Sequence, residues 1–316
     1  MSAIRLAVIG TGAFGQNHLR VIRENPRAKL VGVLDTDLHK ATLAAQSNGC
    51  AVFQNLDELQ GNIDAAIVST PTISHADVAC AVLAQGIDVL VEKPIASDLA
   101  AAQRIIDASK GRVVQVGHLE RFNAAVLALR KMVSTPLFFE IHRMSQFTAR
   151  SLDVDVVLDL MIHDIDLVLD MVQAQPEEIR AAGISILSKK VDIANVRLAF
   201  ASGCVANITA SRVSTERVRK MRLFQPSQYV SIDYSRQDGA VFTVGAEQKI
   251  SFQTLPVSKV EPLKAQLDAF LDSIETRQPP ACGAPQATKA LEVACGILAK
   301  IEEHASLVSQ TLASAP

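Results

Sequence analysis

The sequence lacks an excess of charge of either sign. Its 31 lysine and arginine residues nearly balance its 33 aspartate and glutamate residues, which gives a formal net charge of −2 at pH 7. A protein that binds nucleic acid or an anionic membrane through charge usually carries a clear positive excess. The balance therefore gives no reason to expect a nucleic-acid or membrane partner.

Long apolar runs are also missing. No charge-free stretch reaches the roughly 20 residues that a membrane-spanning helix needs, and the longer stretches contain glycine and polar residues. No secretory signal is visible after Met1, because Arg5 lies in a run that is better explained as the first strand of a nucleotide-binding domain. We therefore expect a cytoplasmic protein.

Cysteine is sparse and irregularly placed. The five cysteines are odd in number, and none forms a C-x-x-C pair. Secreted scaffolds that depend on disulfides usually show an even, regularly spaced set. We expect reduced thiols, and we expect no metal, because no set of cysteine, histidine and aspartate has the spacing of metal ligands.

What the sequence does contain is a glycine-rich hexad between an apolar run, 4–9, and a segment that can continue as a helix, 16–24. Gly10 would permit a tight turn, Gly12 would let the backbone approach a pyrophosphate, and Gly15 would let the helix pack closely on the strand. Free amide groups at the helix N-terminus favour phosphate there. We predict a dinucleotide cradle formed by Gly10, Thr11, Gly12, Ala13, Phe14 and Gly15.

The expected cofactor preference depends on Asp35, which follows a second apolar run, 30–34. An acidic side chain at this place accepts hydrogen bonds from the adenosine ribose and repels a 2′-phosphate, so NAD is favoured over NADP. The alternative is that Asp35 is a solvated turn residue beside Asp37. His39 and Lys40 lie close by and leave room for some tolerance of NADP.

Over the first 120 residues, apolar runs alternate with helical stretches, which is typical of a doubly wound parallel sheet. Further strands of this sheet are expected at 64–70, 88–92 and 112–117. Because parallel strands are joined by right-handed crossovers, their carboxyl ends share one edge. We predict an α/β chain whose N-terminal Rossmann domain covers residues 1–119.

The pattern changes after residue 120 to strand-like runs separated by short turns. These runs lie at 137–146, 178–188, 191–200, 203–212, 217–224 and 228–234, and helices are expected at 154–174, 261–277 and 285–304. Many strands joined by short turns predict a large, mostly antiparallel sheet with helices on one face. Residues 120–316 are therefore expected to form an α+β domain.

Three short segments fall at the carboxyl ends of the predicted parallel strands. They are 70–71 (Thr-Pro), 92–94 (Glu-Lys-Pro) and 117–118 (Gly-His). Ligands of open α/β sheets bind in the crevice at that edge. Pro71 and Pro94 end their strands because proline has no N–H to donate. We therefore expect Lys93 beside the dinucleotide, with a plain surface lysine as the alternative.

The predicted helix 154–174 carries a second group of polar residues. Four of them are spaced four, three and four apart and so share one face: Asp159, His163, Asp166 and Asp170. A neutral imidazole suits the removal of a hydroxyl proton near pH 7, and a lysine ammonium can polarise the same oxygen. Taken alone, Asp159 and His163 are more often a solvated helix face than a catalytic pair. A domain that faces a dinucleotide crevice favours the catalytic interpretation.

These motifs together resemble the glucose-fructose oxidoreductase, inositol dehydrogenase and rhizopine catabolism (Gfo/Idh/MocA) family over nearly the whole chain. The resemblance rests on the hexad, TPTISH (70–75), VLVEKPIA (89–96), GHLERFN (117–123) and DLMIHDID (159–166). It implies an NAD-dependent dehydrogenase that acts on a ring hydroxyl. The alternatives are a free-polyol dehydrogenase of the inositol type and a dinucleotide-binding regulator without turnover. The intact motif lysine and histidine argue against the regulator.

The resemblance also implies roles for single residues. Lys93 would contact the nicotinamide ribose and the substrate hydroxyl, His163 would be the acid and base, and Asp159 would orient the substrate. Further cofactor contacts are expected at Thr70, Pro71, His75, Glu92 and Pro94.

A substrate site is implied as well. His118, Arg121 and Asn123 match a stretch that lines the sugar site, although His118 and Arg121 could equally cap the domain junction. Arg143 and Arg150 are candidates for binding a substrate diphosphate. A crowd of basic residues on one strand pair could do the same or could face solvent or another subunit: Arg212, Arg217, Arg219, Lys220 and Arg222.

The string from Arg143 to NITASRVS (207–214) is most similar to the branch of the family that oxidises the 3-position of UDP-N-acetylglucosamine. The resemblance thus implies a small-molecule partner, a sugar or sugar nucleotide. Because this family often pairs its second-domain sheets between subunits, and one face of 191–234 carries Asn207, Thr209 and Ser211, we expect a homodimer or homotetramer.

Overall fold

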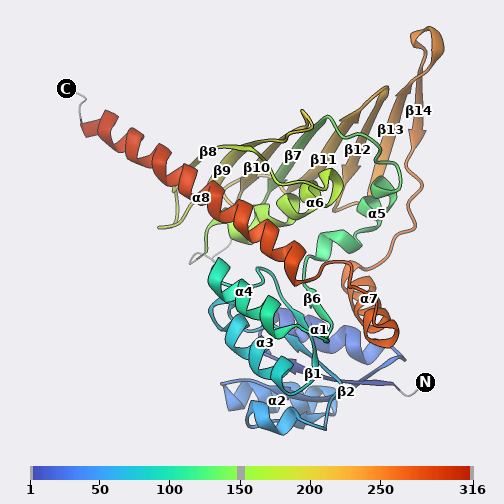
Figure 1. Cartoon of the computed structure of the whole chain (residues 1–316), viewed down its shortest axis with the longest axis vertical. Coiled ribbons are helices and arrows are strands. Elements are labelled where there is room, and N and C mark those ends of the chain that lie inside the picture. The colour runs from blue at the N-terminus through green and yellow to red at the C-terminus, as the bar shows by residue number, and fades with distance from the viewer. Residues whose placement is uncertain (1–2, 148–153, 314–316) are drawn as a thin grey trace. The chain divides into compact units, whose positions relative to one another are not determined.

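The computed structural model of the chain describes residues 3–147 and 154–313 (Figure 1). The chain divides into two compact units. The first comprises Met1–Leu119 and Glu261–Thr288, and the second comprises Glu120–Val260 and Lys289–Pro316. No helix in the described ranges is both long enough and apolar enough to cross a membrane. Arg150, one of the two diphosphate candidates, lies outside the described residues.

A six-stranded sheet, with all neighbouring strands parallel, forms the centre of the first unit. Its strands are β1 (Ile4–Ile9), β2 (Ala28–Leu34), β3 (Ala51–Val52), β4 (Ala65–Val68), β5 (Asp88–Val91) and β6 (Val114–Val116). They lie in the order β3-β2-β1-β4-β5-β6, so the order reverses between β1 and β4. The predicted Rossmann fold is confirmed, and its ligand-binding crevice is expected at that reversal.

The helices of the first unit follow its strands. They are α1 (Ala13–Glu24), α2 (Leu38–Asn48), α3 (His75–Ala84), α4 (Leu99–Ala108) and α7 (Pro262–Thr276), with short turns η1 (Leu56–Leu59) and η2 (Thr72–Ser74). Sequence patterns place α7 in the second domain, but the structure places it here. Leu267 and Phe270 of α7 are buried in one core with Leu6 and Leu19. Because α7 buries its apolar face in this core, residues 261–288 belong to the first unit.

An eight-stranded sheet forms the second unit, in the order β14-β13-β12-β11-β7-β10-β9-β8. Its strands are β7 (Phe138–Met144), β8 (Glu178–Ile184), β9 (Ile193–Ala199), β10 (Val205–Ser211), β11 (Val218–Gln225), β12 (Gln228–Asp233), β13 (Asp238–Val244) and β14 (Ile250–Thr254). Only β7 and β10 pair in parallel, so the predicted mostly antiparallel sheet is confirmed. The strands β13 and β14 were not expected, because β13 has one buried residue and every residue of β14 is exposed, so neither shows an alternating pattern.

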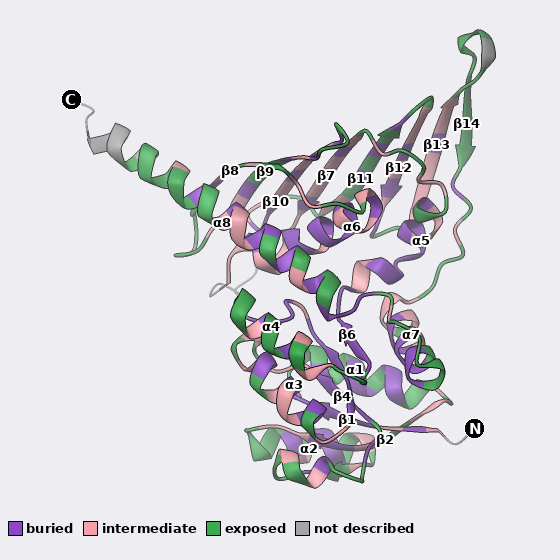
Figure 2. Ribbon diagram, viewed as in Figure 1, coloured by how far each residue is buried: buried purple, intermediate pink, exposed green. Residues whose placement is uncertain are grey.

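One face of this sheet packs against helices, and Figure 2 shows buried residues along both the strands and the helices α5 and α6. The covering elements are α5 (Ala124–Arg130), the turn η4 (Val157–Met161), α6 (Ile162–Val172) and the middle of α8 (Ala284–Ala313). The short turn η3 (Leu119–Phe122) precedes α5, and η5 (Ala246–Gln248) lies between β13 and β14. Residues of the strands alternate between buried and accessible, and the buried ones, such as Ile141 and Val196, share a core with Ile165 and Ile297.

Candidate active site

The glycine hexad connects β1 to α1 as the sequence predicts. Gly10 has a φ of +94°, and a Cβ there would lie 2.7 Å from the backbone of Ser69. A Cβ on Gly15 would lie 2.0 Å from the carbonyl oxygen of Gly10, so both positions require glycine. A Cβ on Gly12 would meet nothing within 4 Å, and Gly12 caps α1 without a side chain. The backbone at the N-terminus of α1 is thus open to a phosphate group.

A cavity of about 690 Å³ in the first unit adjoins this turn. Its lining includes Gly12, Ala13, Phe14, Asp35 and Thr70 together with Pro71. Phe14 is 53% exposed, whereas Thr11 is buried beneath the turn. The cavity therefore brings together most of the predicted cofactor contacts, which lie on the turns after β1, β2 and β4. Its size suits part of a dinucleotide.

Asp35 is fixed by the hexad itself. Its Oδ2 accepts hydrogen bonds from the backbone N–H and the hydroxyl of Thr11, both at 2.7 Å, and its Oδ1 accepts one from the Asp37 N–H at 2.9 Å. Partial burial raises the pKa of Asp35, but these bonds outweigh burial and lower it below its ordinary value. Asp35 is therefore an anchored carboxylate at neutral pH. Lys40 also lines the cavity, and its Nζ lies 3.3 Å from Asp37.

His75 lies below the crevice edge rather than on its surface. It is 1% exposed, with Nδ1 2.8 Å from the carbonyl oxygen of Pro94 and Nε2 2.9 Å from that of Thr70. Burial lowers the pKa of His75, so the ring is neutral at pH 7 and can donate to only one of the two carbonyls. The ring lies between the turns that follow β4 and β5, with one nitrogen toward each. His75 thus contacts the backbone of two predicted cofactor segments and donates a hydrogen bond to one of them.

The Glu92-Lys93-Pro94 turn follows β5 and contains a cis peptide bond between Lys93 and Pro94. Glu92 is 8% exposed, and its Oε1 lies 2.7 Å from Nε2 of His18 on α1. Its Oε2 accepts a hydrogen bond from the Lys93 N–H at 3.3 Å. Burial raises the pKa of Glu92, but the interactions with His18 and Lys93 together outweigh burial, and the pKa lies below its ordinary value. A buried carboxylate thus supports the backbone from which half-buried Lys93 extends.

His18 was not identified from the sequence. It lies on α1 among the buried residues Leu19 and Ile22, and its side chain is 1% exposed. The available signal was a histidine on the apolar stripe of a helix, which more often indicates a core residue than a functional one. Its partner could not be inferred, because Glu92 lies 74 positions further along the chain.

Asp159 and His163 lie in the second unit, on η4 and α6. Both are half-buried. The backbone over Val157–Met161 forms a π-type turn before the regular helix Ile162–Val172, in place of the uninterrupted helix 154–174 that we expected. Such turns are rare and are frequent at functional sites. The other two acids of the predicted face, Asp166 and Asp170, are engaged in ion pairs. Arg121 donates to both of them, with bonds of 2.7 to 2.8 Å.

The predicted substrate residues of this unit are buried. Arg121 is 4% exposed, Asn123 is 3% exposed and Arg143 is 0% exposed. Asn123 caps α5 and donates to the carbonyl oxygen of Tyr234 at 3.0 Å. Arg143 donates to both carboxylate oxygens of Asp164, at 2.6 and 2.7 Å. A guanidinium engaged in this way has no exposed surface for a substrate diphosphate, and it ties α6 to the sheet instead.

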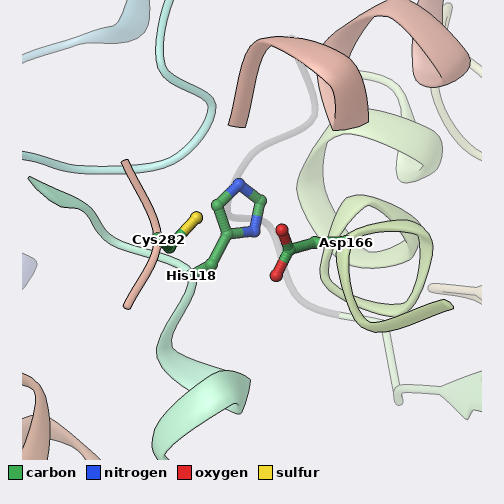
Figure 3. A group of neighbouring side chains, drawn as sticks. All are labelled: His118, Asp166 and Cys282. Carbon is green, nitrogen blue, oxygen red and sulfur yellow. The ribbon is translucent and has the colours of Figure 1, made fainter. Parts of the chain in front are cut away.

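His118 follows β6 in the first unit and is 1% exposed. Figure 3 shows its ring beside Cys282, with ligand atoms of the two within 4.8 Å of each other. Asp166, also drawn there, belongs to the second unit, where Arg121 binds it. Within the described part of the first unit this group supplies two ligand atoms, fewer than protein zinc sites have. The group therefore carries no metal assignment, and the absence of a metal stays a prediction.

The crowd of basic residues on β11 and nearby turns separates into different environments. Arg222 lies on the accessible face and pairs with Glu140 at 2.8 Å. Arg212 is 6% exposed, lies 3.8 Å from Asp192 and donates to the Val154 carbonyl. Arg219 lies directly opposite Arg143 on the face that the helices cover. The basic residues on β11 and the nearby turns thus do not form one surface patch.

Comparisons with known proteins agree with the motifs. The Gfo/Idh/MocA oxidoreductase family, described as an NAD-binding Rossmann fold, matches residues 4–118, and the Gfo/Idh/MocA C-terminal domain matches residues 116–225. UDP-N-acetylglucosamine 3-dehydrogenase of Acidithiobacillus ferrooxidans is 32% identical over 310 residues, which cover 96% of this chain and 98% of that protein. Inositol 2-dehydrogenase of Rubrobacter xylanophilus is 28% identical over 67% of this chain and 65% of its own.

Solved structures show the same similarity. That of the Acidithiobacillus ferrooxidans enzyme matches with a TM-score of 0.91 at 31% identity, covering 96% of this chain and 99% of the other. Levoglucosan dehydrogenase, in complex with NADH and levoglucosan, matches with a TM-score of 0.87 over 96% and 98% of the two chains. Its 16% identity supports the fold alone. The chain belongs to the Gfo/Idh/MocA family of oxidoreductases and carries the NAD-binding Rossmann domain of that family.

Proposed function

We propose that this oxidoreductase is an NAD-dependent dehydrogenase that oxidises a ring hydroxyl of a sugar nucleotide, with the 3-hydroxyl of UDP-N-acetylglucosamine as the candidate. The observation that carries the proposal is the presence of Lys93, Asp159 and His163 in a chain that is similar over 96% of its length to a UDP-N-acetylglucosamine 3-dehydrogenase. The inositol dehydrogenases match about two thirds of the chain or less, which supports the sugar nucleotide over a free polyol.

The residues around the cavity of the first unit fit NAD. The open backbone at Gly12 and the N-terminus of α1 would hold the pyrophosphate, and the anchored carboxylate of Asp35 would accept the ribose hydroxyls. A second negative charge, on a 2′-phosphate, would meet Asp35 at close range, so NADP is the less favourable ligand. When bound, NAD supplies the acceptor for the hydride of the substrate carbon.

Three side chains of the proposed site act on the substrate, and two of them act on its reacting hydroxyl. His163 accepts the hydroxyl proton on a neutral imidazole nitrogen, which suits proton transfer near pH 7. The ammonium of Lys93 stabilises the negative charge that develops on the same oxygen. Asp159 accepts a hydrogen bond from the sugar and orients the ring. Thr70, Pro71, His75, Glu92 and Pro94 complete the proposed cofactor side, of which His75 and Glu92 act through the backbone that they hold.

The proposed sugar site also involves His118, Arg121 and Asn123. Arg121 binds Asp166, three residues after His163 on α6, and so fixes the helix that carries the proposed base. Asn123 fixes the start of α5. Their burial supports a role in holding the walls of the site rather than in direct contact with the sugar. Arg143 likewise supports α6 through Asp164.

We further propose that the accessible face of the eight-stranded sheet pairs with a second copy of the chain. A row of stacked and edge-on rings crosses that face from Phe138 through Phe224, Tyr229 and Phe242 to Phe252, with centroids 4.7 to 5.8 Å apart. Phe252 is 61% exposed and Ile250 is 73% exposed. An exposed apolar row of this length is typical of a protein interface.

The test is a screen for NADH formation at 340 nm. UDP-N-acetylglucosamine, UDP-glucose, free N-acetylglucosamine and myo-inositol are supplied with NAD to the full chain. Turnover of a UDP-sugar with none of the free compounds supports the proposal. Turnover of myo-inositol alone identifies a polyol dehydrogenase, and NAD binding without turnover of any sugar identifies a binding protein; either result overturns the proposal.

A further inference from the structure

Arg219 is held beside another arginine in the second unit. The two residues are direct partners in the antiparallel pairing of β11 with β7, and both side chains lie on the face of the sheet that the helices cover. Arg143 binds both carboxylates of its surroundings, Asp164 at 2.6 Å and Glu120 at 2.8 Å. No carboxylate within residues 3–147 and 154–313 pairs with Arg219.

The guanidinium of Arg219 is also only partly satisfied by hydrogen bonds. One of its terminal nitrogens donates to the hydroxyl of Ser145 at 3.2 Å. Its Nε is buried and has no hydrogen-bond partner among the described residues. A buried N–H without an acceptor costs free energy, so such a group needs a ligand or a water. The side chain as a whole is half-buried, which leaves it accessible to a ligand.

Positive charge is in excess around Arg219, which also favours an anionic ligand. Burial and the charge of Arg143 lower the pKa of Arg219 to about 10, so the residue stays protonated at neutral pH although its surroundings disfavour the charge. An anion beside Arg219 would relieve both the repulsion and the unused N–H donor. A guanidinium suits phosphate oxygens in particular, because its planar donors match them in pairs.

The location of Arg219 relates it to the proposed active site. Asp164, which Arg143 binds, adjoins His163 on α6. Ser145, which Arg219 contacts, directly follows β7. Arg219 therefore lies on the same side of the sheet as this ion pair, directly opposite Arg143, which holds the helix of the proposed base.

We propose that Arg219, with the hydroxyl of Ser145 beside it, binds the diphosphate of the nucleotide-sugar substrate. This inference deepens the proposed function and rests on it for the identity of the ligand. Arg143 supports the site because it pairs with the neighbouring carboxylates, Asp164 and Glu120. The positive charge of Arg219 is then left to attract the substrate anion. The site distinguishes a nucleotide sugar from a free sugar, because only the former carries the anion.

The experiment measures binding without turnover. UDP and uridine are titrated calorimetrically into the full chain, into Arg219→Gln and into Arg219→Lys. The parent is expected to bind UDP at least about 10-fold more tightly than uridine, because a charge-assisted bond to phosphate is lost with uridine. Arg219→Gln is expected to weaken UDP about 10-fold or more while uridine changes less than about 2-fold. Arg219→Lys keeps the positive charge, and its affinity for UDP is expected to lie between those of the parent and Arg219→Gln.

A matched control removes a different arginine of the same unit. Arg180 lies on the edge strand β8 with its side chain 74% exposed and pairs with Glu178 at the surface. Arg180→Gln makes the same change in net charge and is expected to leave the Kd for UDP within about 2-fold. A loss as large as that of Arg219→Gln would show a general effect of charge and overturn the proposal.

NADH titration separates the two possible sources of the phosphate. Arg219→Gln is expected to bind NADH within about 2-fold of the parent, which also shows that the variant is folded. A loss of NADH binding equal to the loss of UDP binding would assign the anion to the cofactor and overturn the proposal, as would unchanged UDP binding. The test is independent of turnover: UDP binding through Arg219 in a chain that oxidises no sugar nucleotide would contradict the proposed function alone.

Discussion

His18 and Glu92 form a buried pair in which Nε2 of the imidazole lies 2.7 Å from Oε1 of the carboxylate. The remaining oxygen of Glu92 accepts the backbone N–H of Lys93. A Cβ on Gly117 would lie 2.7 Å from that oxygen, so glycine at this position makes room for the carboxylate. The pair therefore connects α1 to the turn that carries the proposed catalytic lysine.

Replacing His18 by leucine is expected to leave the Glu92 carboxylate buried without its donor. A buried carboxylate that loses a hydrogen-bond donor costs about 3 kcal/mol, and we expect a decrease of that size in the free energy of unfolding. Urea denaturation followed by circular dichroism measures it. His39→Ala, at an exposed position on α2, is the control and should change stability by less than about 0.5 kcal/mol. Equal effects of the two changes would refute a structural role for the pair.

Asp35→Ala is expected to weaken NAD binding and to reduce the preference for NAD over NADP, because it removes both the ribose acceptor and the charge that repels a 2′-phosphate. Fluorescence titration of both reduced cofactors measures this. Asp77→Ala removes an exposed carboxylate on α3 that pairs with Arg104 at the surface, and it should leave both affinities unchanged. Equal or tighter binding of NADPH by the parent chain would contradict the assignment.

The buried ring of His75 predicts a pH dependence of stability. Its pKa is lowered by burial, against the opposing effects of the Pro94 and Thr70 carbonyls and the charge of Glu92. Below about pH 6.5 the unfolded chain therefore binds a proton at His75 that the folded chain does not, and the free energy of unfolding falls as the pH is lowered through that region.

His75→Gln removes this titration, so its stability should fall less steeply between pH 7 and pH 5 than that of the parent, whatever its absolute stability. Denaturant unfolding at several pH values gives both slopes. Identical slopes would show that His75 titrates normally and would contradict its burial as a neutral ring.

The aromatic row on the accessible face predicts an assembly of two or four chains of 33.9 kDa each. Light scattering at micromolar concentration measures the mass. Phe252→Glu places a charge in the row and should shift the protein toward one chain mass, whereas Lys300→Glu on the surface of α8 should not. A single-chain mass for the parent would exclude the proposed interface.

The parts of the site that could be predicted from the sequence are those that one local segment specifies. The hexad needs its glycines because the chain folds back on itself within six residues, as the contact between Gly10 and Gly15 shows. The Glu92-Lys93-Pro94 turn and the position of Asp35 follow from where apolar strands end. Six of the eight strands of the second sheet also follow from alternation along the chain.

The remaining features depend on pairings between distant positions, which one sequence does not reveal. The sequence left Arg143 as a candidate for a substrate diphosphate, and left Arg121 either at the sugar site or capping the domain junction, because a basic residue near a site is ambiguous until its partners are known. Their partners are the acids of α6, Asp164 and Asp166, 21 and 45 positions away. The return of α7 to the first unit similarly depends on a core formed by residues more than 200 positions apart, such as Leu6 and Phe270.

Lys93 and His163 are proposed to act together on one hydroxyl oxygen. The most direct measurement is kcat for the parent, His163→Ala, Lys93→Ala and the double variant, with a substrate that the parent oxidises. Each single change is expected to lower kcat about 100-fold or more, and the double change should cost far less than the product of the two, because groups that act on one oxygen behave as a unit. NADH affinity of His163→Ala should stay close to that of the parent. Near-parental turnover in His163→Ala, or fully multiplicative losses in the double variant, would contradict a joint action of Lys93 and His163 on the substrate oxygen.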